Sequence, residues 1–432
     1  MHSAYRSSYI SELASDMDGK EVLLGGWVHE VRNIGKIVFM ILRDHTGTVQ
    51  VVGKEGAVKA EVIRSMDLPK ESVVCVRGVV KQSSESKSGI EIIPTSIENL
   101  NPLTAQIPFE VTGKVPADMD VRLDNRHIDM RRLDTTSIFN IQSTVLSSFR
   151  EVMLKSGLEE IRTPAIVEAA TEGGADLFRV EYFEKAAYLA QSPQLYKQLA
   201  VIGGMDRVFM VVPVFRAEKH NTVFHLNEIT QMDAEIGFSD HRDAISLLKK
   251  AIKGILSDVA EERQADLKRL GAEMSEPKIK EITYRKAVSA LNSEGNEIKF
   301  GEDLSRDAEV TLCKLFGDLL VVKEYPKKIR AFYSMPNGSD SETCNSFDLL
   351  YRGLEISSGA QRIHLPDMLV SSIKAHGLDP SNFDFYVNAF RQGAPPHAGW
   401  SLGLERLTMQ ITGMKNIREC CLFPRDRVRL KP

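Results

Sequence analysis

The sequence predicts an α+β protein with two domains, a small N-terminal five-stranded β-barrel and a larger domain with an antiparallel sheet flanked by helices. Three observations support this. The length of 432 residues allows two or three domains. Short strand-like runs fill the first hundred residues, and beyond about residue 137 strand-like runs adjoin one another while long helices group apart. The predicted boundaries are 1–104 for the barrel, 105–135 for a hinge or linker and 136–432 for the larger domain.

The order of elements in the first hundred residues identifies the type of barrel. Three strands, one helix and two further strands follow one another, at 22–32, 36–44, 46–53, 57–66, 72–81 and 89–97. This is the order of an OB-fold barrel, which binds single-stranded nucleic acid on the face of its early strands. A small barrel used only for packing would show the same order, so topology alone leaves both readings open.

The remainder of the chain alternates between helical and strand-like patterns. A helix is predicted from residue 138, with Gly157 at its C-terminal cap, and a second long helix is predicted over 242–270. Strands are predicted at 158–166, 186–190, 207–215, 229–238, 319–323, 328–335 and 347–358. The chain has no P-loop and no glycine-rich dinucleotide fingerprint.

Composition excludes several classes of protein. The 55 basic and 59 acidic residues give a net charge of −4, which argues against a protein that coats nucleic acid by bulk charge. Five cysteines without a CxxC pair fit a reducing compartment better than a disulfide framework. The sequence shows neither a secretion signal nor an apolar run long enough to cross a membrane. We therefore expect a cytoplasmic protein with no membrane contact.

Polar residues alternate along the predicted strand ITQMDAEIGF. Gln231, Asp233 and Glu235 share one face of this strand. The charged loop FRAEKHNTVFHLNE precedes it, so an arginine lies at one strand end of a hairpin and carboxylates lie on the return strand. Such a hairpin suits a polyphosphate and a polar ligand, but a surface cluster of salt bridges has the same pattern.

A second hairpin carries two acidic residues. Asp348 and Glu355 are seven apart, so they converge only if the chain turns near Arg352–Gly353. Two converging carboxylates beside Ser357 and Ser358 would suit magnesium bridging phosphates. Two solvated carboxylates remain the alternative.

A third pattern lies in PPHAGWSLGLERLTM. Gly399 and Gly403 have helical spacing, with Glu405 and Arg406 on the next turn, which predicts a helix that allows close backbone approach. As an isolated pattern, a core helix ending in an ion pair is the commoner explanation.

Together, these three segments resemble motifs 2 and 3 of the class II aminoacyl-tRNA synthetases, and GLEEIRTPAIV resembles motif 1, which implies a homodimer. ATEGGADLF, QSPQLYKQ, FRAEKHNTVFHLNE, FDLLYRGLEISSGAQR and PPHAGWSLGLERL are close to the aspartyl-tRNA synthetases of archaeal and eukaryotic type. The segment GWVHEVRNIGKIVFMILRDHTGTVQ resembles the anticodon-binding OB domain of that family. The resemblance covers essentially the whole chain.

The resemblance implies that aspartate attacks ATP to form aspartyl-adenylate, and that the aspartyl group then passes to the 3′ end of tRNA(Asp). The nucleophile is already ionised, so positioning and charge stabilisation should suffice. The implied catalytic residues are Arg216, Glu355 and Arg406. The implied ATP contacts are Arg216, Glu218, Phe224, His225, Leu226, Glu355, Gly403, Leu404, Glu405 and Arg406. Mg²⁺ would be held by Asp348, Glu355 and Ser358. Many relatives carry phenylalanine where this chain has Ile229, so stacking of adenine by this side chain is not expected.

The resemblance also implies a cationic pocket and a set of tRNA contacts. Lys197 and Arg362 would grip the aspartate side chain, within an amino-acid site of Glu172, Gln194, Lys197, Arg216, Asp233, Ser358 and Arg362. The implied anticodon contacts are His29, Arg32, Phe39, Gln50, Lys87 and Glu91, with Phe39 stacking on the middle base. The implied acceptor-stem contacts are Lys219, His220, Asn221 and Thr222.

Two markers disagree about tRNA specificity. Strict relatives often carry tryptophan where this chain has His29, and histidine accompanies relaxed enzymes that also charge tRNA(Asn). Lys87 resembles the strict type, and the sequence favours the strict enzyme slightly.

Three other classes of protein share parts of this sequence pattern. Asparaginyl-tRNA synthetase is disfavoured by Lys197, since an asparagine ligand would leave that cation unpaired. A class II-like amide synthetase is disfavoured by the OB domain. A non-catalytic tRNA-binding paralogue would be expected to lose Arg216, Glu355 or Arg406, and all three are present.

Overall fold

The computed structural model describes residues 3–86, 88–168, 177–219, 221–274 and 276–432. Its contacts divide the chain into two units, Met1–Thr136 and Ser137–Pro432. Within the described residues, no helix is both long and apolar enough to cross a membrane.

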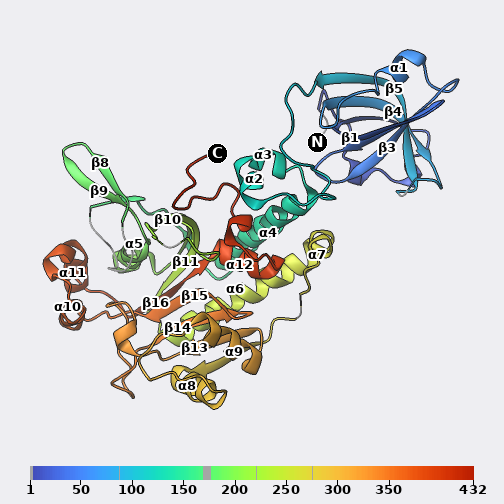
Figure 1. The fold of residues 1–432 in the computed structure, drawn as a ribbon. Coiled ribbons are helices and arrows are strands. Elements are labelled where there is room, and N and C mark those ends of the chain that lie inside the picture. Colours follow the sequence, from blue (N-terminus) through green and yellow to red (C-terminus); the bar gives the residue numbers. More distant parts are fainter. Residues whose placement is uncertain (1–2, 87, 169–176, 220, 275) are drawn as a thin grey trace. The chain divides into compact units, whose positions relative to one another are not determined.

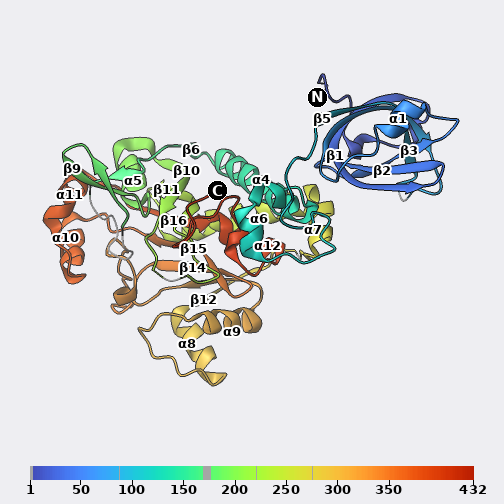
Figure 2. The ribbon, with the colours of Figure 1, turned by 45° about the horizontal axis from the view of Figure 1, so that its top comes forward.

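The first unit contains a closed five-stranded barrel with strand order β1-β2-β3-β5-β4 (Figure 2). Its elements are β1 (Glu21–Ile34), β2 (Ile37–Arg43), β3 (Thr48–Lys54), α1 (Ala60–Arg64), β4 (Val73–Gln82) and β5 (Ile90–Asn101). Alternate residues point inward and form a closed apolar core that includes Val28, Met40 and Val51. The predicted OB-fold barrel is confirmed.

Part of the stretch predicted as a linker is helical. Two short helices, α2 (Met119–Asp124) and α3 (Arg126–Asp129), lie within it. Asp118 caps α2 by accepting a hydrogen bond from the Asp120 N–H. The buried Asp129 carboxylate accepts hydrogen bonds from Arg122 and Arg126 at 2.8 and 2.6 Å.

The second unit is built on an eight-stranded sheet with strand order β12-β13-β14-β15-β16-β11-β10-β6 (Figure 1). Most neighbours are antiparallel, and the outer pairs β12–β13 and β10–β6 are parallel. The strands are β6 (Glu159–Glu160), β10 (Arg207–Phe215), β11 (Glu228–Gly237), β12 (Ile279–Thr283), β13 (Leu319–Lys323), β14 (Ser346–Tyr351), β15 (Leu354–Gln361) and β16 (His397–Gly403). A separate three-stranded sheet contains β7 (Ile166–Val167), β9 (Lys185–Leu189) and β8 (Arg179–Tyr182).

Helices cover the large sheet unequally. The main apolar core joins one face of the sheet to α4 (Leu133–Lys155), α6 (His241–Glu262) and α12 (Leu404–Thr412). On the opposite face, at the β12–β14 edge, a second core contains α8 (Tyr284–Ser293) and α9 (Arg306–Phe316). The remaining helices are α5 (Gln194–Ala200), α7 (Gln264–Leu270), α10 (Pro366–Ala375) and α11 (Asp384–Arg391).

Three local predictions were wrong. The helix predicted over 242–270 is two helices, α6 and α7, separated at Arg263, whose backbone departs from helical values. The run 328–335 is not a strand, and only a short 3₁₀ turn, Lys327–Ile329, forms there. The run 158–166 yields only the short strands β6 and β7 at its ends.

Candidate active site

Four neighbouring strands bring a row of polar side chains together on one face of the large sheet. Asp348 of β14 pairs with Ser358 of β15, Ser358 with Ser401 of β16, and Ser401 with Asp233 of β11. Directly paired residues lie on the same face of a sheet. The antiparallel order of β14, β15, β16 and β11 therefore assembles residues that are up to 168 positions apart in the chain.

The alternation predicted for β11 is confirmed. Met232, Ala234 and Ile236 lie in the main apolar core beneath the sheet. Asp233 and Glu235 point to the other face, and both are buried there. Burial of polar side chains on one face and apolar side chains on the other fixes the register, because a slip of one residue would exchange the two sets.

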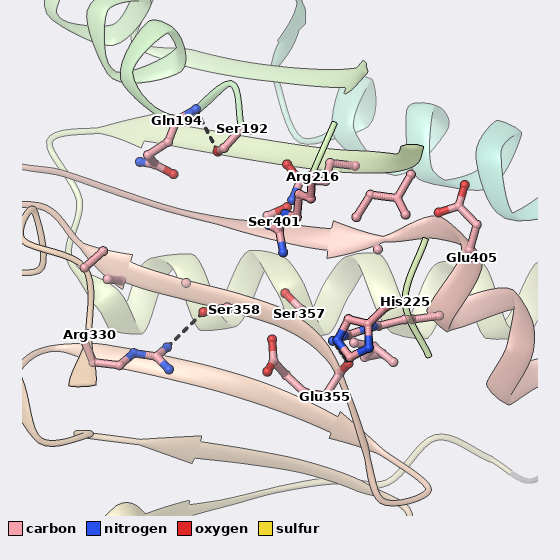
Figure 3. A pocket seen from close by; sticks show the side chains of 18 of the residues that line it. Ser192, Gln194, Arg216, His225, Arg330, Glu355, Ser357, Ser358, Ser401 and Glu405 are labelled. Carbon is pink, nitrogen blue, oxygen red and sulfur yellow. Dashed lines mark hydrogen bonds between the residues drawn. The ribbon is translucent and has the colours of Figure 1, made fainter. Parts of the chain in front are cut away.

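A cavity of about 300 Å³ opens over this face (Figure 3). Of the predicted residues, those that line it are Gln194, Arg216, Glu218, Phe224, His225, Leu226, Glu355, Ser358, Arg362, Gly403, Glu405 and Arg406. The residues Lys197, Asp233, Asp348 and Leu404 do not line it, although all four are buried. Glu172, His220 and Lys87 lie outside the described residues.

Arg216 lies where β10 ends and the charged loop begins. Its backbone is tied to Asn227 at the other end of the loop, through the Arg216 N–H to the Asn227 carbonyl at 2.9 Å and the Asn227 amide to the Arg216 carbonyl at 2.7 Å. Among the described residues its guanidinium has no hydrogen-bond partner, and it faces the cavity. A fixed fork of donors at this point suits an anionic ligand.

The chain turns at Arg352–Gly353, as predicted for the hairpin that carries Asp348 and Glu355. Both residues have positive φ, 49° and 72°, which is the geometry of a type I′ hairpin turn. A register shift between Leu349 and Leu350 adjusts the pairing of β14 with β15. Burial raises the pKa of the Glu355 carboxyl, and the nearby charge of Asp348 raises it further. The turn thus places the two carboxylates on adjacent strands, where their charges interact.

Asp348 already has a cationic partner that the sequence did not reveal. Arg330 donates to its two carboxylate oxygens at 2.8 and 2.5 Å and also to the Ser358 hydroxyl at 2.9 Å (Figure 3). The Arg330 guanidinium also lies 4.5 Å from the centre of the Tyr325 ring. Arg330 therefore holds Asp348 and Ser358 in one geometry.

Lys197 and Arg362 form a buried network with two carboxylates. Lys197 Nζ lies 2.9 Å from Asp233 Oδ2 and 3.4 Å from Glu235 Oε2. Arg362 donates to both oxygens of Glu235, at 2.8 and 3.1 Å. The two cations and two anions balance one another, so an asparagine ligand would not leave Lys197 unpaired, contrary to the expectation from the sequence. Arg362 reaches the cavity, whereas Lys197 lies behind its wall.

Several buried polar atoms at this end of the site have no partner among the described residues. They include Gln194 Nε2, Gln231 Oε1, Asp233 Oδ1 and Ser357 Oγ. Buried polar groups in folded proteins are nearly always paired. Gln194 and Gln231 line the cavity, so their unpaired donor and acceptor are expected to pair with a small polar ligand.

The helix predicted from the spacing of Gly399 and Gly403 is wrong. Both glycines lie on strand β16, and α12 begins only at Leu404. A Cβ at position 399 would lie 2.1 Å from Glu235 Oε2 and 2.2 Å from the Ala234 carbonyl. The missing side chain therefore leaves room for the Glu235 carboxylate rather than for a helix neighbour.

Comparison with known families shows the family to which this chain belongs. Residues 118–427 match the family of class II tRNA synthetases (D, K and N), and residues 22–100 match the OB-fold nucleic acid binding domain. The chain belongs to the class II tRNA synthetases. It is therefore an aminoacyl-tRNA ligase, which joins an amino acid to tRNA with ATP.

Relatives of this synthetase are similar over the whole chain. It is 46% identical to the aspartate–tRNA(Asp/Asn) ligases of Methanocaldococcus jannaschii and Archaeoglobus fulgidus, over 99% and 98% of its own length and 98% and 99% of theirs. Among solved structures, the asparaginyl-tRNA synthetase of Pyrococcus horikoshii with asparaginyl-adenylate has a TM-score of 0.93 at 33% identity, covering 98% of this chain and 99% of that one. The aspartyl-tRNA synthetase of Entamoeba histolytica has a TM-score of 0.90 at 32% identity, covering 98% and 92%.

The loop of the synthetase that follows Arg216 is held from the C-terminal end of the chain. Arg418 donates to the Thr222 carbonyl at 3.0 Å and also to the side chain of Asn221. Arg427 donates to the Lys219 carbonyl at 3.0 Å. Thr222 in turn bonds His225 Nδ1 at 2.6 Å. Neither arginine is predictable from a local sequence pattern, because each acts on groups about 200 residues away.

Four of the predicted anticodon residues, Arg32, Phe39, Gln50 and Glu91, share one face of the barrel. Arg32 pairs directly with Phe39, Ile41 pairs with Gln50, and Gln50 pairs with Glu91 across β1, β2, β3 and β5. Phe39 and Gln50 are half-buried and Arg32 is exposed. An aromatic ring among polar side chains on a barrel face is typical of a platform for single-stranded nucleic acid.

The titration of Glu405 is expected to make the free energy of unfolding depend on pH. Both of its oxygens lie 3.1 Å from the Thr230 N–H, which ties the start of α12 to β11. Burial raises the pKa of Glu405 to about 7. The folded state thus binds this proton more tightly than the unfolded state, and the stability it contributes is present below the unfolded value of 4.5 and lost as pH rises through about 7.

Glu405→Gln keeps one acceptor for Thr230 and removes the titration. Between about pH 5 and about pH 8, its thermal unfolding temperature should therefore fall less than that of the wild type. The same change at the exposed Glu261 serves as the control and should follow the wild type. Parallel curves for Glu405→Gln and the wild type would show that Glu405 is ionised throughout.

Proposed function

We propose that this synthetase is an aspartate–tRNA ligase that charges both tRNA(Asp) and tRNA(Asn). Relatives 44–46% identical over nearly the whole chain bear the name aspartate–tRNA(Asp/Asn) ligase. The observation that carries the proposal is the buried network of Lys197, Arg362, Asp233 and Glu235 beside a cavity with converging unpaired polar atoms. The names of the relatives favour the relaxed enzyme, against the slight preference of the sequence for the strict one.

The first step needs positioned charge rather than a side-chain base. The α-carboxylate of aspartate is the nucleophile, and it attacks the α-phosphate of ATP with pyrophosphate leaving. Arg216 faces the cavity with a free guanidinium among the described residues, so it serves to bridge the two anions. Arg406 is held by a hydrogen bond of 3.0 Å to the Glu355 carbonyl and serves the outer phosphates.

The residues of the acidic hairpin suit magnesium. Asp348, Glu355 and Ser358 offer hard oxygen ligands. Burial, with the nearby charge of Asp348, raises the pKa of Glu355, and a divalent cation would offset both effects. When bound there, Mg²⁺ would neutralise phosphate charge and hold the leaving group. Arg330 would keep Asp348 and Ser358 aligned for this role.

Aspartate selection follows from charge and the unpaired atoms. Arg362 lines the cavity and carries the positive charge nearest to the bound side chain, while Lys197 supports the network from behind. Gln194 offers an unpaired donor in the cavity, and Gln231 offers an unpaired acceptor for an ammonium group. Asp233 lies behind the cavity wall and supports the site through Lys197. Glu172, which lies outside the described residues, completes this proposed site.

tRNA is proposed to bind both units of the chain, with the anticodon on the barrel and the acceptor stem at the loop after Arg216. Arg32, Phe39, Gln50 and Glu91 would bind the anticodon, and the loop that contains Lys219, Asn221 and Thr222 would contact the acceptor stem. We also propose a homodimer formed through the residues of GLEEIRTPAIV, and activity in the cytoplasm.

Phe39→Ala tests the anticodon face. Loss of one stacking partner costs about 1–3 kcal/mol, so tRNA charging should weaken by roughly tenfold or more. Aspartate-dependent ATP–pyrophosphate exchange should change little, because adenylate formation needs no tRNA contact at the barrel. Tyr5→Ala, at an exposed aromatic residue of the same unit, is the control. Equal loss of both activities in Phe39→Ala would contradict the assignment.

The proposed function is tested by aminoacylation of purified tRNA(Asp) and tRNA(Asn) side by side, each with aspartate and with asparagine. We expect aspartate on both tRNAs and asparagine on neither. Charging with asparagine would identify the chain as an asparaginyl-tRNA synthetase, and no charging at all would point to the non-catalytic paralogue.

A further inference from the structure

A buried charged cluster lies beside His29 on the OB-fold barrel. Arg43, at the end of β2, is 2% exposed and donates to both oxygens of Glu71 at 2.8 and 2.7 Å. Arg131 adds a third hydrogen bond to Glu71 at 3.1 Å. Glu71 itself has a positive φ of 69°, a conformation that a non-glycine residue keeps only where its surroundings over-determine it. The cluster therefore fixes the Arg43 guanidinium firmly.

This guanidinium also sets the protonation of His29. Arg43 Nη1 lies 2.8 Å from His29 Nδ1. A guanidinium has five donors and no acceptor, so Nδ1 must accept and cannot carry a proton. A neutral imidazole then has its proton on Nε2. The opposite tautomer would direct two donors at each other across the same distance.

The surroundings keep the ring neutral. Burial lowers the pKa of His29, and the positive charge of Arg43 lowers it further, against the weaker opposing effect of Glu71, Glu110 and Glu30. His29 is therefore a neutral donor at physiological pH, rather than a cation that would attract any phosphate.

The backbone directs His29 outward. The register between β1 and β2 shifts between Val28 and Glu30, so His29 sits in a bulge without a cross-strand partner. The imidazole is half-buried, and its Nε2 is neither buried nor bonded to any residue that the structure describes. Arg43, which bonds His29, lies on the same side of β2 as Phe39. The Nε2–H of His29 therefore belongs to the face proposed to bind the anticodon.

We propose that Arg43 is a positioning residue that locks His29 as a neutral Nε2–H donor for an acceptor oxygen on an anticodon pyrimidine. This inference rests on the proposed function. The genetic code makes the anticodons of tRNA(Asp) and tRNA(Asn) differ in the third base, C in one and U in the other. Both pyrimidines carry the O2 acceptor, whereas their position-4 groups differ, an amino donor in C and a carbonyl acceptor in U. A fixed donor that reads the shared oxygen accepts both tRNAs.

The protonation state is measured directly on the full chain with ¹⁵N-labelled histidine. Long-range ¹H–¹⁵N spectra at neutral pH distinguish protonated from unprotonated ring nitrogens, and the signals lost in His29→Gln assign the residue. We expect an unprotonated Nδ1 and a protonated Nε2. A proton on Nδ1, or a doubly protonated ring, would overturn the inference even if both tRNAs are charged.

Two substitutions at His29 test what the donor does. The glutamine amide nitrogen lies as far from Cβ as Nε2 does, whereas the asparagine amide nitrogen lies where Nδ1 does and would oppose Arg43. We expect His29→Gln to charge both tRNAs in nearly the wild-type ratio, and His29→Asn to lose about tenfold or more in kcat/KM for both. The exposed His45→Gln is the matched control and should leave the ratio unchanged. Better charging by His29→Asn than by His29→Gln would contradict the donor role.

Arg43→Lys removes the fork while keeping the charge. A lysine cannot serve Glu71 and His29 together in this geometry, so we expect the spectrum of His29 to show both tautomers and the charging of both tRNAs to weaken. A single Nε2–H tautomer in a folded Arg43→Lys protein would show that Arg43 is not what locks the ring. If Arg43→Lys does not fold, the wild-type spectrum and the two His29 variants still decide. Failure of the wild-type enzyme to aspartylate tRNA would refute the proposed function. The tautomer of His29 is measured without tRNA, so that result is independent of the proposed function.

Discussion

Lys197→Leu is expected to abolish most aspartate-dependent ATP–pyrophosphate exchange. The substitution removes one of two cations from a buried network and leaves Asp233 and Glu235 to share Arg362. Truncating one partner of a buried charge pair costs about 2–5 kcal/mol, which corresponds to some tens- to thousands-fold in activity. The excess negative charge would also repel the side chain of aspartate. Exchange is measured with aspartate at several concentrations, so that loss of binding is separated from loss of kcat.

The same substitution also lowers stability, and this must be measured alongside. Circular dichroism and thermal unfolding show whether the variant is folded under assay conditions. Lys155→Leu makes the same chemical change at an exposed helix position and should keep full activity. A folded Lys197→Leu enzyme with near-normal exchange would refute the role of Lys197 in aspartate activation.

Arg216→Gln is expected to reduce kcat/KM for adenylate formation by about 10²–10³-fold, the usual loss when one donor to the developing charge is removed. Glutamine keeps a polar side chain but is shorter and lacks the charge and the fork that bridges two anions. The substitution should raise the KM for both ATP and aspartate, because Arg216 is proposed to contact both.

The chain offers a matched control on the same strand. Arg207 begins β10, at the end opposite Arg216, and its exposed side chain lies 3.6 Å from Asp206. Arg207→Gln should leave exchange unchanged. Similar losses in both variants would mean that the effect comes from the strand rather than from contact with the substrates.

The parts of this fold that the sequence predicts well are those with strong local patterns. The barrel strands alternate apolar and polar residues, and the alternation of Asp233 and Glu235 with Met232 and Ala234 gave the correct faces of β11. Gly353 marked the turn that lets Asp348 and Glu355 converge. In each case a periodicity or a backbone requirement is visible within a few residues.

Contacts between segments that are distant in the chain could not be predicted from the sequence pattern. Arg330 lies in a run predicted as a strand, and only the fold places it against Asp348. Gly399 was assigned to a helix because four-residue spacing is helical, whereas its real constraint is the Glu235 carboxylate of the neighbouring strand. The free positive charge assigned to Lys197 is balanced by carboxylates 36 and 38 residues further along the chain.

Arg216, Arg406 and the acidic hairpin are proposed to act on one amino acid and one ATP. The buried network of Lys197, Arg362, Asp233 and Glu235 is proposed to act on the same two substrates. ATP–pyrophosphate exchange by the wild-type chain, with aspartate and asparagine compared in the absence of tRNA, tests this most directly. We predict exchange with aspartate and a markedly lower kcat/KM for asparagine, because the Arg362 guanidinium that lines the cavity favours an anionic side chain. Equal exchange with both amino acids, or exchange with asparagine alone, would contradict it.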